Sequence, residues 1–182
     1  MNKIISLFAV FCIAIALLGC GGGGGGGSPV APPAPTFDPA LRNDLPTVAA
    51  SYDSLAAALP DSNGLSASDR VAKFMLEIGE DFQNKAGTLA STSLKDITLD
   101  RLDRYTINYY TFIPEKYTKI DDNTIEVTTY MSISATRKPG KEGGFDGTTV
   151  LSPSPVVTWK KYGDGKWRIL KGLPYLSDEV SF

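Results

Sequence analysis

The longest regular pattern in this 182-residue chain is an alternation of two kinds of side chain from Thr124 to Thr136. A period of two is typical of a strand that is buried on one face and wet on the other. Such half-buried strands belong to antiparallel sheets. The face predicted to be buried carries Ile125, Val127, Thr129, Met131, Ile133 and Ala135, and the wet face carries Glu126, Thr128, Tyr130, Ser132 and Ser134.

The sheet is predicted to end in a hairpin whose turn is residues 163–165. Two glycines supply the positive φ that a three-residue turn needs. The resulting register pairs Trp159 with Ile169 and Lys160 with Arg168, so apolar and basic side chains take opposite faces. The inward side chains are Val157, Trp159, Trp167 and Ile169, and the outward ones are Lys160, Lys166 and Arg168.

Two further strands are predicted on either side of this pattern. Residues 105–113 are rich in β-branched and aromatic side chains, which favours a strand. Residues 148–162 are a second candidate, which we expect to be broken or to lie on an edge at Pro153 and Pro155. Proline has no N–H to donate to a strand ladder.

Helices are predicted in the first half of the domain. An apolar stripe at helical spacing runs from Leu41 to Leu59, with Asp44 as the expected cap and Pro60 as the end. Packing on its own domain is favoured over a coiled-coil seam. A second helix is expected from a Ser66 cap to Gly87, and a short third helix from a Thr98 cap to Tyr105. The apolar stripe is Leu41, Leu45, Val48, Tyr52, Leu55 and Leu59.

This order, helices and then a sheet that closes with the hairpin Trp159-Lys-Lys-Tyr-Gly-Asp-Gly-Lys-Trp167-Arg-Ile, resembles the NTF2-like, cystatin-type α+β fold over residues 44–170. The resemblance implies N-terminal helices packed on a curved antiparallel sheet of about four strands. It also implies a cone-shaped pocket, which in some members holds a small apolar ligand or an acid–base site. The architecture is similar to that of small lipoproteins supporting outer-membrane assembly, which implies a protein-binding alternative.

The first 20 residues are a basic start and an apolar run that leads into Leu17-Leu18-Gly19-Cys20. This resembles the lipobox of bacterial lipoproteins, which implies cleavage between Gly19 and Cys20 and a lipid on the Cys20 sulfur. The apolar run, residues 4–18, would extend about 22 Å as a helix. That is short of the roughly 30 Å of bilayer hydrocarbon, so a signal peptide is favoured over a membrane-spanning helix.

We expect residues 1–19 to be the signal peptide, 20–36 the lipidated cysteine and its tether, and 37–182 one domain. The tether is seven glycines followed by a proline-rich stretch, a composition typical of flexible or extended linkers. Gly21 follows the cysteine where an aspartate would imply inner-membrane retention. The expected location is the outer membrane, facing the periplasm; a bacterium with one membrane would carry the domain on its outer surface.

Composition excludes several kinds of chemistry. The chain has no histidine, and its two cysteines are Cys12, which leaves with the signal peptide, and Cys20, which takes the lipid. Ser-His-Asp and Cys-His catalysis and zinc sites of imidazole or thiolate are therefore excluded. We expect no catalytic residue, no cofactor and no metal site. The net charge of −2 argues against a nucleic-acid partner.

Three functional hypotheses follow. The first is a membrane-tethered, non-catalytic module that binds a small apolar ligand in a pocket drawn from Tyr105, Tyr109, Tyr110, Phe112, Met131, Trp159 and Trp167. The second is an envelope structural or assembly protein that meets another protein or anionic lipid through Tyr130, Lys160, Lys166 and Arg168. An enzyme is the least favoured, and it would need a carboxylate such as Asp100 or Asp103 turned into an open cavity.

Overall fold

The computed structural model describes residues 39–84, 87, 90–142, 147–150 and 153–173. Internal contacts divide the chain into Met1–Pro33 and Ala34–Phe182, and all described residues belong to the second unit. Within the described residues, no helix combines the length and the apolarity needed to cross a membrane. The helices are α1 (Pro39–Asp44), α2 (Pro46–Ala58), η1 (Asp61–Asn63, a 3₁₀ turn), α3 (Ala67–Met75) and α4 (Ser91–Arg104).

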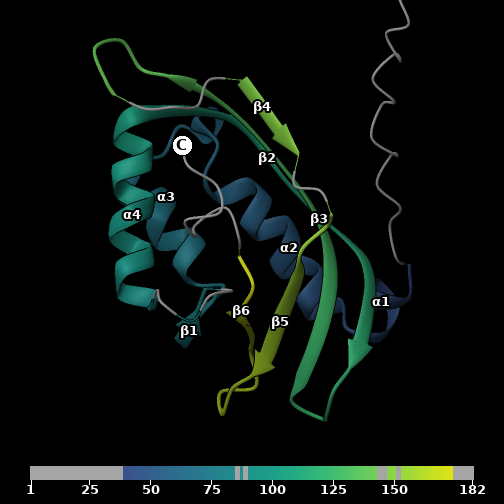
Figure 1. The fold of residues 1–182 in the computed structure, drawn as a ribbon. Helices are drawn as coiled ribbons and strands as arrows, with labels where there is room; N and C mark the ends of the chain where they lie inside the picture. Colours follow the sequence, from purple (N-terminus) through teal and green to yellow (C-terminus); the bar gives the residue numbers. More distant parts are fainter. Residues whose placement is uncertain (1–38, 85–86, 88–89, 143–146, 151–152, 174–182) are drawn as a thin grey trace, which may run out of the picture. The chain divides into compact units, whose positions relative to one another are not determined.

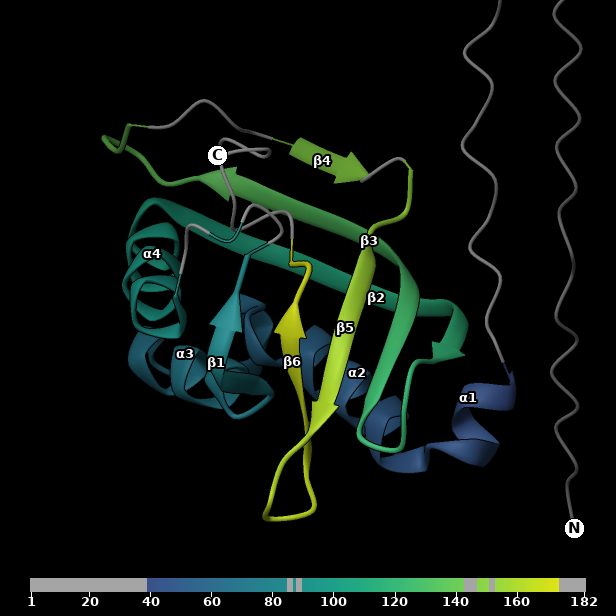
Figure 2. The ribbon, with the colours of Figure 1, turned by 60° about the horizontal axis from the view of Figure 1, so that its bottom comes forward.

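The described residues form one curved six-stranded sheet with the helices packed against it (Figures 1 and 2). The strands are β1 (Ile78–Gln83), β2 (Tyr105–Lys119), β3 (Thr124–Arg137), β4 (Gly147–Val150), β5 (Val156–Lys161) and β6 (Trp167–Lys171). Their order is β1-β6-β5-β3-β2, and β4 pairs with β3. The predicted α+β class is confirmed, with six strands instead of about four.

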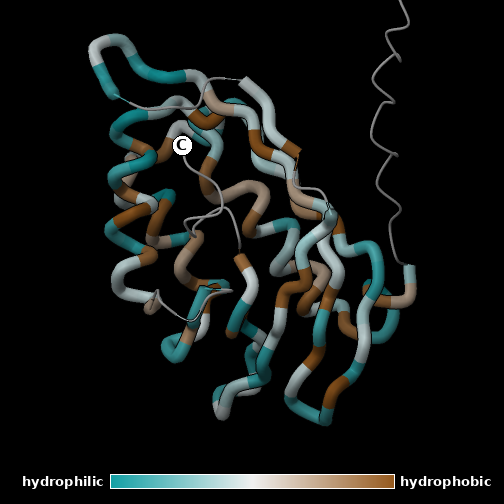
Figure 3. The backbone as a smooth tube through the Cα atoms, viewed as in Figure 1, coloured by the Kyte–Doolittle hydropathy of each residue, from teal (hydrophilic) through white to brown (hydrophobic). Residues whose placement is uncertain are grey.

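The sheet curves because β2 carries register shifts opposite β3, between Ile107 and Tyr109 and between Pro114 and Lys116. Such irregularities bend a strand and increase its twist. The alternation of apolar and polar residues along the long strands is visible in Figure 3. The side of β3 that the sequence predicted to be buried is buried, and Thr129 on that side bonds Tyr52 of α2; Ser132, predicted to be wet, is buried as well.

The hairpin register is confirmed. Trp159 pairs with Ile169 and Lys160 with Arg168, and both tryptophans point inward. The stretch from 148 to 162 is divided into β4 and β5, as expected from its prolines.

The predicted second helix is wrong beyond Met75. After one tightened turn, in which the Leu76 N–H donates to the Lys73 carbonyl, the chain enters β1. β1 runs parallel to β6, and the Ile169 N–H donates to the Glu77 carbonyl. Gly79 lies in β1, and glycine is a poor residue for a helix interior.

Two predicted caps are also wrong. Asp44 does not cap α2, whose N-cap is Leu45; the Asp44 carboxylate instead accepts a hydrogen bond from the Tyr117 hydroxyl at 2.5 Å. Thr98 lies inside α4, where its buried hydroxyl donates to the Leu94 carbonyl at 2.7 Å. Such a bond to the preceding turn satisfies a hydroxyl within a helix. Ser66 caps α3 as predicted.

The interior between α2 and the sheet is filled by aromatic side chains joined by hydrogen bonds. The Trp159 Nε1–H donates to the Tyr52 hydroxyl at 3.0 Å, and that hydroxyl lies 2.7 Å from the Thr129 hydroxyl. The Tyr52 and Trp159 rings are tilted with centroids 5.0 Å apart. All three side chains are buried.

Replacing Trp159 with alanine should lower the free energy of unfolding by about 3–5 kcal/mol, because a fully buried ring leaves a cavity. Lys161→Ala, at an exposed position of the same strand, is the control and should change it by less than about 0.5 kcal/mol. Urea unfolding measures both. An effect at Lys161 as large as that at Trp159 would contradict the inward position of the Trp159 ring.

Candidate functional site

Three adjoining surface cavities meet at Met75, the last residue of α3. They have volumes of about 480, 400 and 430 Å³. Met75 lines all three, Ser91 at the start of α4 lines the first two, and Arg168 on β6 lines the first and the third. We call this group of cavities the Met75 junction.

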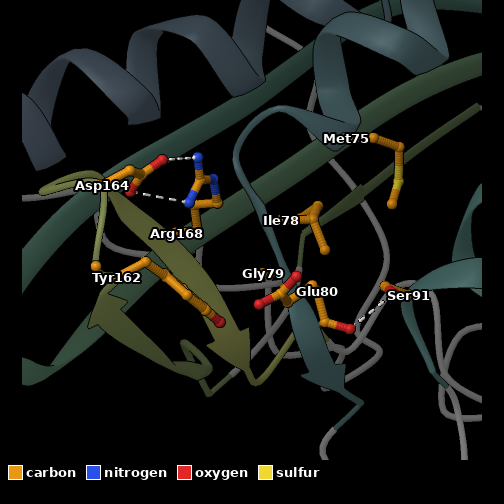
Figure 4. A pocket seen from close by; sticks show the side chains of 9 residues that line it. Met75, Ile78, Gly79, Glu80, Ser91, Tyr162, Asp164 and Arg168 are labelled. Atoms are coloured by element: carbon orange, nitrogen blue, oxygen red, sulfur yellow. Dashed lines mark hydrogen bonds and ion pairs between the residues drawn. The ribbon is translucent and has the colours of Figure 1, made fainter.

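The acidic cavity, of about 480 Å³, lies between β1 and the β5–β6 hairpin and is shown in Figure 4. It presents the carboxylates of Glu80 and Asp164, the Tyr162 ring and the Arg168 guanidinium. The Ser91 hydroxyl donates to the Glu80 backbone carbonyl at 3.1 Å, which links the start of α4 to β1.

The apolar cavity, of about 400 Å³, lies between α3 and α4. Its walls include Ala72, Met75 and Leu99, with Lys95 as the charged residue in its lining. The basic cavity, of about 430 Å³, is formed by the start of α2, the end of α3 and the hairpin. Its lining is Thr47, Ser51, Met75, Leu76, Glu77, Gly165, Lys166, Trp167 and Arg168.

A network on the outward side of the hairpin fixes the wall of the acidic cavity. The Tyr162 hydroxyl and the Lys160 Nζ both donate to the Asp81 carboxylate, the latter at 2.6 Å. These contacts join β1 to the far strand of the hairpin, across β6. Gly79 makes room for them, since a Cβ there would lie 2.0 Å from the Tyr162 hydroxyl oxygen.

The contacts in this network change the pKa values of Asp81 and Tyr162. Burial opposes ionisation of Asp81, but the hydrogen bonds from Lys160 and Tyr162 and the charge of Lys160 outweigh it and lower the pKa of Asp81. Burial, together with the Asp81 hydrogen bond, raises the pKa of Tyr162 well above its ordinary value. Tyr162 therefore stays protonated and remains a donor to Asp81.

Arg168 is held by the hairpin turn itself. Its two Nη atoms donate to the Asp164 carboxylate at 3.3 and 2.6 Å, and its guanidinium carbon lies 5.4 Å from the Tyr162 ring centroid. The same carboxylate accepts the Lys166 backbone N–H at 3.0 Å, which closes the turn. Gly165 has a φ of 79°, as the predicted turn requires.

The predicted pocket residues lie elsewhere. Tyr105, Tyr110, Phe112, Met131 and Trp159 are buried in the hydrophobic core, and none of them lines a cavity of the Met75 junction. Of the remaining two, Trp167 is 9% exposed and lines the basic cavity. Tyr109 is 43% exposed, and its hydroxyl donates to the Thr148 hydroxyl at 3.4 Å.

The predicted basic patch is divided by the structure. Lys160 and Arg168 are each paired with a carboxylate, and Lys166 lies in the basic cavity. Tyr130 is six residues along β3 from Thr124, the partner of Lys160. At about 3.4 Å per residue it is roughly 20 Å away, so it is not part of this group.

The two carboxylates that an enzyme was expected to need in a cavity, those of Asp100 and Asp103, do not point into the interior. Asp100 is paired with Arg104, and Asp103 lies 2.7 Å from the Lys141 Nζ; both aspartates are exposed. The described residues contain no group of three or more His, Cys, Asp or Glu side chains that could hold a metal ion.

Residues 79–81 of β1 were not predicted as site residues. The sequence places Gly79 and Glu80, which line the acidic cavity, and the neighbouring Asp81 in the predicted second helix, so it does not indicate their position beside the hairpin. Gly79 was the local signal against that helix.

No protein-family model matches the chain, and no curated protein matches it. Among solved structures, a conserved protein from Planctomyces limnophilus aligns at 11% identity and a TM-score of 0.52, over 72% of this chain and 94% of its own. An NTF2-like protein from Cytophaga hutchinsonii aligns at 16% identity and 0.46, over 72% and 94%. A ketosteroid isomerase-like protein from Erwinia carotovora aligns at 11% and 0.49, over 71% and 92%. Likeness at these identities concerns the fold alone.

Replacing Asp81 with asparagine should lower the free energy of unfolding at neutral pH by about 1 kcal/mol, since a half-exposed carboxylate loses two charge-assisted contacts. The folded pKa of Asp81 is lowered, so its contribution is present above the unfolded pKa of about 3.9 and is lost as pH falls through the folded value.

The measurement is urea unfolding of both proteins from pH 7 to pH 2, with Glu126→Gln, an exposed carboxylate on β3, as the control. The difference between wild type and Asp81→Asn should shrink below pH 4. A difference that is constant over this range would show that the network contributes nothing through the Asp81 charge.

Proposed function

We propose that this chain is a lipid-anchored, non-catalytic binding module of the bacterial cell envelope, and that it binds a small amphipathic ligand at the Met75 junction. The observation that carries the proposal is the position of the cavities. Buried aromatic side chains such as Tyr52 and Trp159 pack between α2 and the sheet, and three cavities adjoin one another around Met75.

The chemistry of the junction supports binding over catalysis. Asp81 and Asp164, the carboxylates nearest Tyr162 and Arg168, have pKa values below the ordinary range and stay ionised at neutral pH. A general acid or base needs a pKa near the working pH. The absence of histidine from the sequence removes the side chain that most often meets this need.

The alternative, an envelope assembly protein that uses the outward basic face, has less support. Of the residues proposed to meet the partner, Lys160 is paired with Asp81, and Tyr130 lies roughly 20 Å from Lys160 along β3.

The proposed anchor rests on the sequence Leu17-Leu18-Gly19-Cys20 and on the glycine- and proline-rich tether that follows. Two or three acyl chains on Cys20 would hold the chain stably in a bilayer, since each buried methylene contributes about 0.8 kcal/mol. Gly21 favours an outer-membrane location with the domain in the periplasm.

Cys20→Ser should move the protein from the membrane fraction to the soluble fraction, because it removes the sulfur that would carry the lipid. The measurement is fractionation of expressing bacteria, with a precursor-specific size check by mass spectrometry. Cys12→Ser is the matched control and should leave the protein in the membrane fraction. A processed Cys20→Ser protein that still sediments with membranes would contradict the anchor.

Ala72→Trp should weaken binding of the neutral dye N-phenyl-1-naphthylamine at least about tenfold, because the indole would occupy the apolar cavity. The dye's fluorescence increase reports binding. Ala57→Trp, at an exposed position on α2, is the control and should bind as wild type does. Equal dye affinity in wild type and Ala72→Trp would place the ligand outside this junction.

A further inference from the structure

The three cavities of the Met75 junction differ in the charge that they present, and this difference points to one class of ligand. We infer that the ligand is a zwitterionic amphiphile: an apolar chain whose head group carries a phosphate-like anion and an amine or ammonium cation. The inference rests on the binding function proposed above and concerns the same site.

The apolar cavity suits the chain of such a ligand. Ala72, Met75 and Leu99 supply hydrocarbon surface between α3 and α4, and the charged residue of the lining, Lys95, is exposed. Removing an alkyl chain from water is favourable in proportion to the apolar area that is buried.

The basic cavity suits the anion. Lys166 and Arg168 bring two positive charges to it, against the carboxylates of Glu77 in its lining and of Asp164, which pairs with Arg168 from the neighbouring cavity. The hydroxyl side chains Thr47 and Ser51 also line it. Asp164 is about half exposed, and exposed ion pairs are weak, so a phosphate can compete for the Arg168 guanidinium.

The acidic cavity suits the cation. It presents two carboxylates, Glu80 and Asp164, against the one guanidinium of Arg168. The Tyr162 ring forms part of its wall and already attracts two cations of the protein, Lys160 and Arg168, at 5.0 and 5.4 Å from the ring centroid. Figure 4 shows Glu80 and Asp164 on the two sides of this cavity.

The linings of the three cavities carry balanced charge that is separated in space. The acidic residues of the linings are Glu77, Glu80 and Asp164, and the basic residues are Lys95, Lys166 and Arg168. A ligand with one charge would leave the opposite cavity unmatched, whereas a zwitterion matches both. Arg168 borders both charged cavities and Met75 borders all three, so the three cavities adjoin one another.

Four probes with the same decyl chain test the head group: decylphosphocholine, decyl phosphate, decyltrimethylammonium and decyl maltoside. Each is titrated below its critical micelle concentration into the full chain carrying Cys20→Ser, with heat and tryptophan fluorescence recorded. Trp167 lines the basic cavity, so its emission should change on binding. Decylphosphocholine should bind about tenfold more tightly than each of the other three.

Two charge variants assign the cavities. Glu80→Gln should weaken decylphosphocholine and decyltrimethylammonium about tenfold and leave decyl phosphate unchanged. Lys166→Gln should weaken decylphosphocholine and decyl phosphate and leave decyltrimethylammonium unchanged. Glu126→Gln and Lys171→Gln are the controls, because both residues are exposed outside the three cavities and should bind as wild type does.

The outcomes separate this inference from the proposed function. Equal affinity for all four head groups, or tightest binding of a singly charged probe, would overturn the zwitterion while an effect of Ala72→Trp would keep the site. Failure of every decyl probe and of the dye to bind would overturn both. Phosphatidylcholine vesicles distinguish the source: vesicle binding that Lys166→Gln weakens indicates a membrane lipid, and binding of the free probe alone indicates a soluble amphiphile.

Discussion

The fold depends on the hydrogen bonds between Trp159, Tyr52 and Thr129, which join α2 to β5 and β3 in the middle of the domain. Each of these polar atoms is buried, where an unpaired donor costs about 1–3 kcal/mol. Burial raises the pKa of Tyr52 above its ordinary value, so the hydroxyl keeps its proton. Two large rings and their partners therefore occupy the space that a concave sheet would otherwise leave open.

Filling the interior in this way moves the available binding surface to the end of the domain. There α3 is short and β1 begins three residues after Met75, so the cavities beside Met75 are bordered by α2, α3, α4, β1 and the β5–β6 hairpin and not by one continuous wall. The β5–β6 hairpin is fixed against β1 by the contacts of Asp81 with Tyr162 and Lys160. Those contacts hold β1 and the hairpin, which form two walls of the acidic cavity, in fixed positions. Because they depend on the negative charge of Asp81, that charge also stabilises the attachment of β1 to the sheet.

The parts of the fold that the sequence predicted are those in which neighbouring residues determine the structure. The alternation from Thr124 to Thr136 requires only a buried and a wet face, and the register of Trp159 with Ile169 follows from a three-residue turn. β1 could not be found in the same way. Ile78 and Phe82 are four residues apart, a spacing that fits a helix face as well as a buried strand. Their strand state depends on parallel pairing with β6, which lies near the opposite end of the chain.

The candidate site inherits this limit. A pattern of aromatic residues indicates that the side chains are buried. It does not distinguish residues that fill a core from residues that line a pocket. Tyr110 and Phe112, which were predicted to line a pocket, pack edge to face with ring centroids 4.2 Å apart. The outward basic residues were a better guide, since Lys166 and Arg168 both border cavities. What the sequence could not show was the acidic partners. Asp81 lies beside Lys160 because β1 joins the sheet next to the hairpin, and Glu80 on the same strand lines a cavity together with hairpin residues. β1, which the sequence predicted as helix, therefore places acidic side chains beside the basic side chains of the hairpin.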